Sequence, residues 1–464
     1  MSSNSQFENS RQPSFKGWVN IPFPPKKYPF FYGWVIVVVS TLSIICSIPG
    51  QTAGIGLFTD DLIKTLGISR NQLSIAYMAG TIISGLILPF AGKLLDTIGV
   101  RFMSLFASLG LAISLLIMSN VNWFNTKLSI LIPSGLRPIF IASFTFLLVR
   151  FFGQGNMTMV GRVAMARWFN HRRGIATAIS GVPVAFAFSA TPWILNQAIT
   201  AFGWRQACWL MALIVGGAMA LVGILFFRDT PEACGLVMDG LSSEEFLKKK
   251  KIKTHTIYHE FTRNEAIKTL SFWSFALGLA VHGLIITAIA FHITSIGEEM
   301  GKTREQAVLM FFFSSFISIP MWFIVSYFID NTSLRLKWVL MALSLATFSY
   351  TFSLMFFNNP VGWWATIISF GMSSGIWGIL CNVAFPRYFG RKHLGAISGL
   401  NMSIMVIASA IGPIFFSSIR QILGSYRQAC LLTLVLPMVV FVLSLVTKNP
   451  QRKYESRNLS DNFQ

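Results

Sequence analysis

One arginine within a strongly apolar stretch is the residue best suited to do chemistry in this chain. Arg150 lies in the middle of the run 143–154. A cationic side chain at the centre of a bilayer costs about 2.5–3.5 kcal/mol on insertion scales, so it usually faces a polar cavity or a partner. Guanidinium groups bind carboxylates through two parallel hydrogen bonds. Arg150 is therefore a candidate for binding an anion, with helix packing through backbone carbonyls and Gln154 as the alternative.

The sequence offers no embedded carboxylate to neutralise this arginine. None of the 17 Asp and Glu residues falls in the core of a predicted segment. An unpaired cation near the membrane midplane favours a mobile anion from solution as its partner. Proton relays in membranes use Asp, Glu or His side chains, which leaves His282 and His292 as candidate proton carriers. The alternative for both is a packed, hydrogen-bonded histidine.

Four further residues are candidates to line a cavity or to lie near one. Gln51 follows a Pro-Gly break, where freed backbone groups can line a cavity. Trp377 and Asn382 lie on a later segment and would add an aromatic wall with few polar groups, which suits an organic ligand. Arg162 lies near the end of the segment that carries Arg150, where it can extend to the membrane surface. Ordinary packing is the alternative for each.

Apolar stretches long enough to cross a membrane must position these side chains. Only 12% of the 464 residues are charged and 53% are hydrophobic, against about 25% charged in an average soluble domain. The predicted segments are 31–54, 71–91, 102–122, 138–163, 174–200, 207–227, 270–296, 304–329, 337–357, 363–385, 394–416 and 428–447. The prediction is thus an all-α integral membrane protein with twelve transmembrane helices.

The formal charge of +20 fits the same interpretation. Lys and Arg gather in the short loops and tails of one side, which is typical of cytoplasmic segments. This placement explains the positive charge, so we expect no nucleic-acid partner. Both termini are then cytoplasmic. The expected parts are a tail at 1–29, a six-helix half at 30–227, a linker at 228–269 with the run Lys248–Lys251, a second half at 270–447 and a tail at 448–464.

An internal repeat relates the two halves. Arg205–Cys208 recurs as Arg427–Cys430, Arg167–Phe169 as Arg387–Phe389, and Gly67–Arg70 as Gly301–Arg304. The separation between copies shrinks along the chain, so the first half holds extra residues. The outer segment 123–137 is the natural place for them, and we expect a surface elaboration with a short helix there.

Two loop motifs are suited to fastening the halves to each other. Gly92 and Gly99 allow a tight turn around Asp96, which can lie against the positive N-terminal end of a helix from the other half, and Arg101 adds a charge partner. The repeat places Asp330 and Arg335 at the corresponding position. Gly92–Arg101 resembles the loop signature of the major facilitator superfamily, differing at Thr97, and Arg150 with Gln154 resembles its fourth-helix arginine motif.

An ordered set of motifs resembles one branch of that superfamily, the monocarboxylate and oxalate/formate transporters. The set covers about residues 30–447 and comprises Phe31–Trp34, Pro49–Thr52, Phe202–Arg205, Arg228–Glu232, Phe291–His292 and Phe389–Arg391. The resemblance implies two pseudo-symmetric six-helix halves and secondary transport of small organic anions, with protons as symport partner or with a counter-anion by antiport.

Other functions predict other features. A drug-efflux type of carrier for neutral or cationic compounds has the same fold, but a cation pump is expected to use a buried Asp or Glu. A membrane sensor is expected to carry a folded output domain, for which the predicted tails and linker are too short. No nucleophile set, metal-ligand spacing or phosphate loop indicates an enzyme or a cofactor. We expect a monomer in the cell membrane whose partners are the substrate and lipid.

Overall fold

The computed structural model describes residues 21–128, 133–240, 257–332 and 334–455. All regular elements in these ranges are helices. The run Lys248–Lys251, most of the predicted N-terminal tail and the end of the predicted C-terminal tail lie outside the described residues.

The helices before the predicted linker include several short or irregular ones. Their bounds are η2 (Pro25–Lys27), α1 (Gly33–Cys46), η3 (Ile48–Gly50), α2 (Thr52–Ile55), η4 (Gly56–Phe58), α3 (Thr59–Leu66), α4 (Arg70–Ser119), α5 (Val121–Lys127), α6 (Arg137–Val149), η6 (Arg150–Met157), α7 (Thr158–Trp168), α8 (Arg173–Phe202), α9 (Trp204–Leu213), η7 (Ile214–Met219) and α10 (Ala220–Phe226). α5 is the short helix expected in the outer segment.

The helices that follow are longer and more regular. Short turns η8 (Glu232–Cys234), η9 (Met238–Gly240) and α12 (Arg263–Ala266) come first. The long helices are α13 (Leu270–Glu299), α14 (Arg304–Asn331), α15 (Leu336–Leu354), α16 (Pro360–Phe389) and α17 (Leu394–Leu423), and the shorter α18 (Tyr426–Thr433) and α19 (Val435–Val446) end the bundle.

Nine stretches of helix in the described part of the chain are long and apolar enough to cross a membrane. The stretch in α4 contains two helices that meet at Gly99, whose backbone is not helical (φ 84°, ψ 169°). A shorter apolar stretch, Arg173–Phe188, lies within α8. This is an all-helical membrane architecture, and the number of twelve spans stays a prediction.

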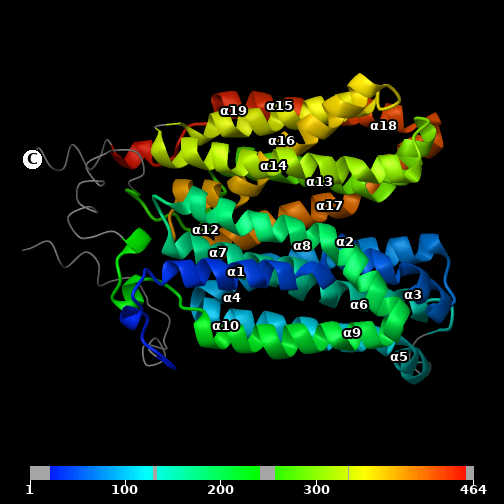
Figure 1. The fold of residues 1–464 in the computed structure, drawn as a ribbon, viewed down its shortest axis with the longest axis horizontal. Helices are drawn as coiled ribbons and strands as arrows, with labels where there is room; N and C mark the ends of the chain where they lie inside the picture. Colours follow the sequence, from blue (N-terminus) through cyan, green and yellow to red (C-terminus); the bar gives the residue numbers. More distant parts are fainter. Residues whose placement is uncertain (1–20, 129–132, 241–256, 333, 456–464) are drawn as a thin grey trace, which may run out of the picture.

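The helices form two bundles (Figure 1). Helices α1 to α10 fill the lower part of the view and α13 to α19 the upper part, and α4 packs along α17 and α8 along α14 where the bundles meet. Residues 21–30 and 448–455 lie at the left of the view. We call that end of the molecule the terminal end and the opposite end the far end.

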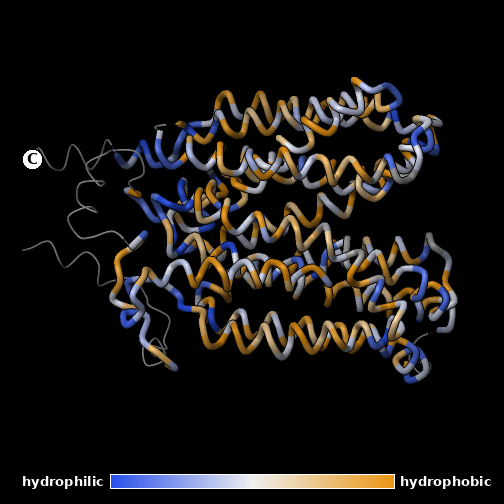
Figure 2. The backbone as a smooth tube through the Cα atoms, viewed as in Figure 1, coloured by the Kyte–Doolittle hydropathy of each residue, from blue (hydrophilic) through white to orange (hydrophobic). Residues whose placement is uncertain are grey.

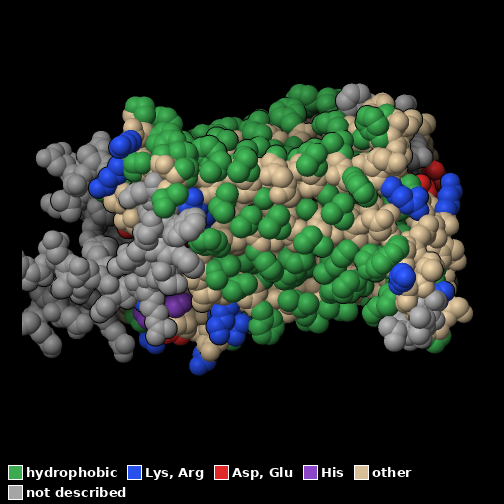
Figure 3. Space-filling model, turned by 90° about the horizontal axis from the view of Figure 1, so that it is seen from below, with side chains coloured by type: hydrophobic (Ala, Val, Ile, Leu, Met, Phe, Trp, Pro, Cys, Tyr) green, Lys and Arg blue, Asp and Glu red, His purple; other side chains and the backbone are tan. Residues whose placement is uncertain are grey.

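Apolar side chains cover the surface between these ends. Hydrophobic residues dominate the middle of the helices in Figure 2, and the face in Figure 3 shows them as a broad band with Lys and Arg at both ends. Large side chains stay exposed there, including Phe90 at 71% and Leu213 at 70%. Soluble monomers rarely expose so large an apolar surface, so the band is the lipid-facing surface.

The buried apolar residues fall into two clusters. The larger one runs through the lower bundle and continues into α19 and the terminal-end parts of α13 to α17. The smaller one contains only residues of the upper bundle, among them Ile293, Tyr350, Phe370 and Tyr426. The bundles therefore share apolar core at the terminal end, and the far end of the upper bundle has a core of its own.

Matching caps begin the second helix of each bundle. Gly67 and Gly301 have left-handed backbones (φ 65° and 71°), which glycine adopts readily. Ser69 and Thr303 then form capping boxes with the Gln three residues later, at α4 and α14. These residues are the two copies of a sequence repeat, so each copy begins a helix with the same type of cap.

Candidate substrate site

Arg150 lies where two irregular segments meet. α1 ends at Cys46, and the turn Ile48–Gly50 breaks the helix before α2. The π-helical segment η6 begins at Arg150, and π-turns inside α-helices are frequent at functional sites. A Cβ atom at Gly50 would lie 2.5 Å from the Val149 carbonyl oxygen and 2.6 Å from Gly153 Cα. Only glycine lets the broken helix approach η6 this closely.

The Arg150 guanidinium is almost fully buried among neutral groups. The side chain is 1% exposed. It donates to the Gly50 carbonyl oxygen at 3.2 Å and to Thr52 Oγ1 at 3.4 Å, and it lies over the Tyr77 ring at 5.2 Å. Its Nε atom has no hydrogen-bond partner among the residues that the structure describes. Within the described residues Arg150 forms no ion pair, so its charge has only partial compensation from dipoles and a ring.

Gln51 and Gln154 flank this arginine without bonding to it. Gln51 Nε2 donates to Ser47 Oγ at 3.2 Å and Thr158 Oγ1 at 3.4 Å. The buried Oε1 atom of Gln154 has no hydrogen-bond partner in the described part of the chain. The alternative role for Arg150 was helix packing through backbone carbonyls and Gln154. The contact with a backbone carbonyl is present, and a hydrogen bond to Gln154 is not among the described contacts.

Arg162 reaches across to the other bundle, which corrects the expectation that it extends to the membrane surface. Its guanidinium lies over the Trp377 ring at 5.7 Å and donates to Met402 Sδ at 3.6 Å. The Trp377 ring in turn packs on the His282 ring, with centroids 5.5 Å apart. Arg162 turns inward because an aromatic face and a sulfur atom on α16 and α17 are within its reach. Its position near the helix end hid this in the sequence.

His282 is buried with one free nitrogen. Its Nδ1 lies 3.2 Å from Thr347 Oγ1, and its Nε2 has no partner among the described residues. Trp377 Nε1 donates to the Leu279 carbonyl oxygen at 3.2 Å. Asn382 donates to the carbonyl oxygen of Gly378, one turn earlier, at 3.0 Å, and its buried Oδ1 has no partner. The unpartnered His282 Nε2 and Asn382 Oδ1 atoms could accept hydrogen bonds from donor groups of a ligand.

His292 belongs to a different environment at the far end. Its Nε2 lies 2.9 Å from the Pro413 carbonyl oxygen in α17, and its Nδ1 lies 3.1 Å from the Tyr426 hydroxyl. Both nitrogens therefore have neighbours in the upper bundle. The structure does not bring His292 together with Trp377 and His282.

Asp96 lies at the N-terminal end of α17, as expected from the helix dipole. It accepts hydrogen bonds from the backbone N–H groups of Gly395 and Ala396, both at 2.8 Å, and pairs with Arg167 at 2.8 Å. The Gly92 backbone makes room for this contact, since a Cβ there would lie 2.2 Å from the Gly395 carbonyl oxygen. The contact joins the two bundles at the terminal end.

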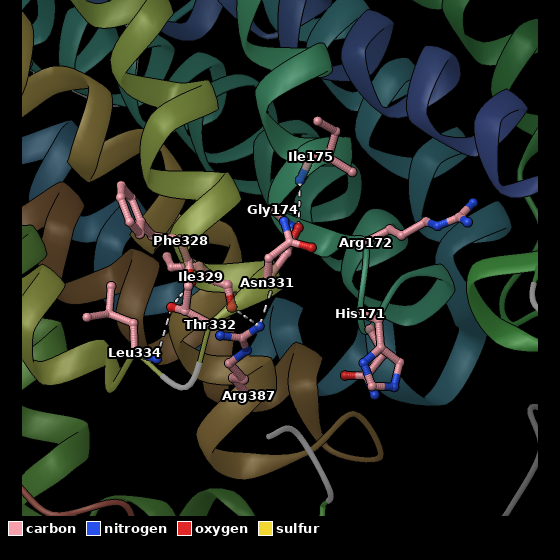
Figure 4. Close-up of polar contacts among 12 residues, drawn as sticks. His171, Arg172, Gly174, Ile175, Phe328, Ile329, Asn331, Thr332, Leu334 and Arg387 are labelled. Carbon is pink, nitrogen blue, oxygen red and sulfur yellow. Dashed lines mark hydrogen bonds and ion pairs between the residues drawn. The ribbon is translucent and has the colours of Figure 1, made fainter. Parts of the chain in front are cut away.

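Asp330 makes the reciprocal contact (Figure 4). It accepts from the backbone N–H groups of Gly174 at 3.2 Å and Ile175 at 3.0 Å, at the start of α8, and lies 3.6 Å from Arg387. Arg387 is the repeat copy of Arg167. The sequence repeat includes both arginines, Arg167 and Arg387. A repeat alone does not predict which group these side chains contact.

Arg101 does not pair with Asp96, and Arg167 takes that place. Arg101 donates to the backbone carbonyls of Ile21 and Ile224. A third aspartate, Asp229, accepts from Val100 N–H beside Gly99 and lies 3.8 Å from Arg167, and burial raises the pKa of its carboxyl group. The loop geometry therefore depends on a residue that follows α10, which the motif alone did not reveal. Arg335 is exposed at the start of α15.

Two acids of the linker region hold the loops that precede α8 and α17. The Asp239 carboxylate accepts from the backbone N–H groups of residues 170–172 at 2.9–3.0 Å. The Glu260 carboxylate accepts from Arg391 N–H at 2.6 Å and Lys392 N–H at 2.8 Å. Asp239 has a left-handed backbone (φ 61°). No sequence signal singled out these acids, because they lie in a polar stretch that indicates only a linker.

Comparison with known proteins gives a family match. A family model described as Major Facilitator Superfamily matches residues 40–413. The riboflavin transporter RibJ of Trypanosoma brucei brucei is 23% identical over 211 residues, which are 45% of this chain and 36% of that protein. The matched stretch thus covers about a third of the relative's length.

Two solved structures are similar in fold. The human organic anion transporter MFSD10 (TETRAN) matches with a TM-score of 0.57 and 13% identity over 88% of this chain and 98% of that one. The proton:xylose symporter XylE, bound to 6-bromo-6-deoxy-D-glucose, matches with a TM-score of 0.62 and 13% identity over 89% of this chain and 94% of that one. Likeness at this identity concerns the fold alone.

Proposed function

Since the chain belongs to the major facilitator superfamily and is a transporter rather than an enzyme, we propose that it moves small organic anions by alternating access. The substrate class is monocarboxylates or small dicarboxylates, carried by symport with protons or by antiport against a counter-anion. The observation that carries the proposal is Arg150, a buried guanidinium whose described partners are all neutral.

A carboxylate is the ligand that suits this arrangement best. Two hydrogen bonds from a guanidinium to a carboxylate are stronger than those to neutral acceptors, and the present partners of Arg150 lie at the long end of the range, 3.2–3.4 Å. An arriving anion would replace weak contacts with strong ones. The free Nε atom offers it a donor that no other described group uses.

A second cation extends the path toward the terminal end. Arg162 follows Arg150 by twelve residues, or roughly 18 Å at the usual helical rise, and the Trp377–His282 stack lies beside it. We propose that an anion bound near Arg150 passes this cluster when the terminal end opens. His282, with its unpartnered Nε2, is the proposed proton carrier for symport.

Uptake into proteoliposomes tests the role of Arg150. The purified protein is assayed with labelled pyruvate, lactate, formate and oxalate, with and without a pH gradient. We expect Arg150→Ala to lower anion uptake roughly ten- to a hundredfold, because hydrogen bonds to a charged group contribute about 1.5–3 kcal/mol.

Arg137→Ala is the matched control for that experiment. Arg137 is a half-exposed cation near the start of α6 that donates to Asn125 Oδ1 at 2.8 Å, so its loss changes the net charge equally without touching the site. Wild-type anion uptake by Arg150→Ala would remove this residue from the mechanism and the proposal with it.

An uncharged aromatic compound is the second candidate substrate. The observation in its favour is the stack of Arg162, Trp377 and His282, which offers ring faces beside free polar atoms, together with the likeness to a riboflavin transporter. Labelled riboflavin in the same vesicles separates the candidates. Riboflavin uptake that survives Arg150→Ala and falls in Trp377→Ala would favour the neutral substrate.

We further propose a monomer in the cell membrane with the terminal end in the cytoplasm. The support is the excess of Lys and Arg expected on that side. The division into two halves, at 30–227 and 270–447 with a linker between, is likewise part of the proposal, supported by the two bundles in Figure 1 and by the repeated caps.

A further inference from the structure

We propose that a basic cavity at the terminal end of the upper bundle binds the phosphate headgroup of an anionic lipid. The cavity has a volume of about 1360 Å³ and lies between the starts of α13 and α15, the end of α19 and the segment that follows it. It is separate from the residues around Arg150 and from the stack of Trp377 and His282. Its cations suit a phosphate group, and they are not part of the proposed transport site.

The cavity wall carries more positive charge than its acids can offset. Apart from Arg387, which pairs with Asp330, the lining cations are Lys268, Arg335, Lys337, Lys448, Arg452 and Lys453. The two carboxylates among the described lining residues are engaged: Glu265 accepts from Thr262 and lies 3.4 Å from His259, and Glu455 accepts from the Tyr258 hydroxyl. The excess charge favours an anion with several acceptor oxygens, and each Lys or Arg near an anionic surface adds attraction.

The cavity lies at the depth of lipid headgroups. Trp273 and Trp338, close in sequence to the lining residues Ser271 and Lys337, are 41% and 48% exposed, and tryptophan concentrates at the membrane–water interface. The Lys337 ammonium lies over the Trp338 ring at 5.1 Å and donates to the Leu445 carbonyl oxygen. A free phosphate in solution needs no such neighbours, whereas a lipid needs its headgroup bound at this level.

The cavity also has an apolar side on the lipid-facing surface. Leu270, Leu445 and Val446 line it and are 44%, 45% and 57% exposed. These side chains belong to the ends of α13 and α19, where the apolar band begins. They can pack against acyl chains while the cations hold the headgroup, which is how a lipid differs from any soluble anion.

The wall of the cavity is rigidly built. Gln451 is 3% exposed, accepts from the backbone N–H groups of Tyr258 and His259 at 3.0 Å, and donates to the carbonyl oxygens of His259 and Tyr388. Tyr454 stacks on His259 with centroids 4.2 Å apart. The last described residues of the chain are thereby fixed to the start of the second bundle, and a preformed site loses less entropy on binding.

The test compares lipids and variants in nanodiscs. Full-length protein is placed in phosphatidylcholine alone, or with phosphatidylserine or phosphatidylinositol 4-phosphate, and bound lipid is counted by native mass spectrometry and titrated with a fluorescent lipid. We expect retention of anionic lipid by the wild type and roughly hundredfold weaker binding by the triple variant Lys268→Gln, Lys448→Gln, Arg452→Gln, since each charge contributes about fivefold.

The control carries the same charge change elsewhere on the terminal end. Lys27→Gln, Lys93→Gln, Arg172→Gln removes three exposed cations of the lower bundle. Equal loss of lipid in this control would overturn the site in favour of general surface attraction. Inorganic phosphate and inositol phosphate form the remaining arm, and tight binding of either with no preference for anionic lipid would overturn the lipid assignment. A thermal unfolding curve in phosphatidylcholine confirms that each variant folds.

Discussion

Arg150 is buried because the chain breaks one helix and widens another at the same place. The Pro-Gly break after α1 frees the Gly50 carbonyl oxygen, and the π-turn of η6 shifts the side chain toward it. The absence of a Cβ at Gly50 lets the two backbones touch. The position of the charge therefore depends on a glycine that makes no polar side-chain contact.

Gly50→Ala should disturb Arg150 without changing any polar side chain. A Cβ would lie within 2.7 Å of three backbone atoms of η6 and its neighbour, and overpacking of this kind costs about 1–3 kcal/mol. We expect a lower unfolding temperature and reduced anion uptake. The control is Gly56→Ala, because that position has helical dihedral angles and no atom within 4 Å of an added Cβ. Equal behaviour of the two variants would contradict the close approach.

At the scale of single residues, sequence reasoning found the charge but not its surroundings. The lack of an acid in the apolar segments was readable, and the described neighbours of Arg150 are indeed neutral. The inward direction of Arg162 was not readable, because its partners Trp377 and Met402 lie more than 200 residues later in the chain. A long flexible side chain follows whichever surface the fold brings to it.

At the scale of helices, two aspartates hold the bundles together through helix N-termini. Asp96 binds the start of α17, and Asp330 binds the start of α8. A carboxylate at a helix N-terminus meets free N–H groups and the positive end of the dipole. Both contacts lie at the terminal end, so this end is fastened from both bundles in the described conformation.

Asp96→Asn should loosen the terminal end more than Asp330→Asn. The Asp96–Arg167 pair is short at 2.8 Å and both side chains are about nine-tenths buried, whereas Asp330 and Arg387 are 3.6 Å apart. Removing one partner of a buried pair costs about 3–5 kcal/mol. Spin labels at Lys93→Cys and Lys392→Cys report the separation of the bundles, and we expect a longer distance population in Asp96→Asn.

The exposed far-end substitution Glu298→Gln serves as the charge control for the spin-label experiment. It removes one carboxylate without touching either aspartate contact. Distance distributions that stay at wild type in both Asp96→Asn and Asp330→Asn would show that these contacts do not hold the terminal end closed.

The sequence predicted the contact of Asp96 with a helix N-terminus, because the motif around Asp96 indicates the loop geometry. Glycines on both sides of Asp96 indicated a tight loop, and the dipole argument gave its partner. The copy at Asp330 lacks the glycines, so only the repeat pointed to it. Asp239 and Glu260 were missed because a carboxylate that binds loop N–H groups has no spacing rule.

At the scale of the molecule, both described chain ends lie on one side of the apolar band. By the positive-inside rule, we propose that this side faces the cytoplasm. The predicted segments agree with the helices in order, but the boundaries differ where helices continue past the membrane or break inside it. Short irregular elements such as η3 and η6 follow from tertiary contacts, which a hydropathy pattern does not contain.

Labelling of single cysteines in intact cells tests this orientation. The replaced residues are both exposed: Lys93 is close in sequence to Asp96 and its terminal-end contact, and Lys127 ends α5, which lies at the far end in Figure 1. A membrane-impermeant thiol reagent should label only Lys127→Cys until the cells are permeabilised. The native cysteines give little background, since Cys46 is half-buried and the other four are buried. Labelling of Lys93→Cys alone would reverse the assignment.

The two apolar clusters have an energetic consequence for the transport cycle. Parting the bundles at the far end divides neither cluster, because the smaller one lies within a single bundle. Parting them at the terminal end exposes apolar surface to water, at about 25 cal/mol for each Å². With the proposed orientation, we expect the empty carrier to rest open toward the outside, so an inhibitor that traps this resting form would have to arrive from that compartment.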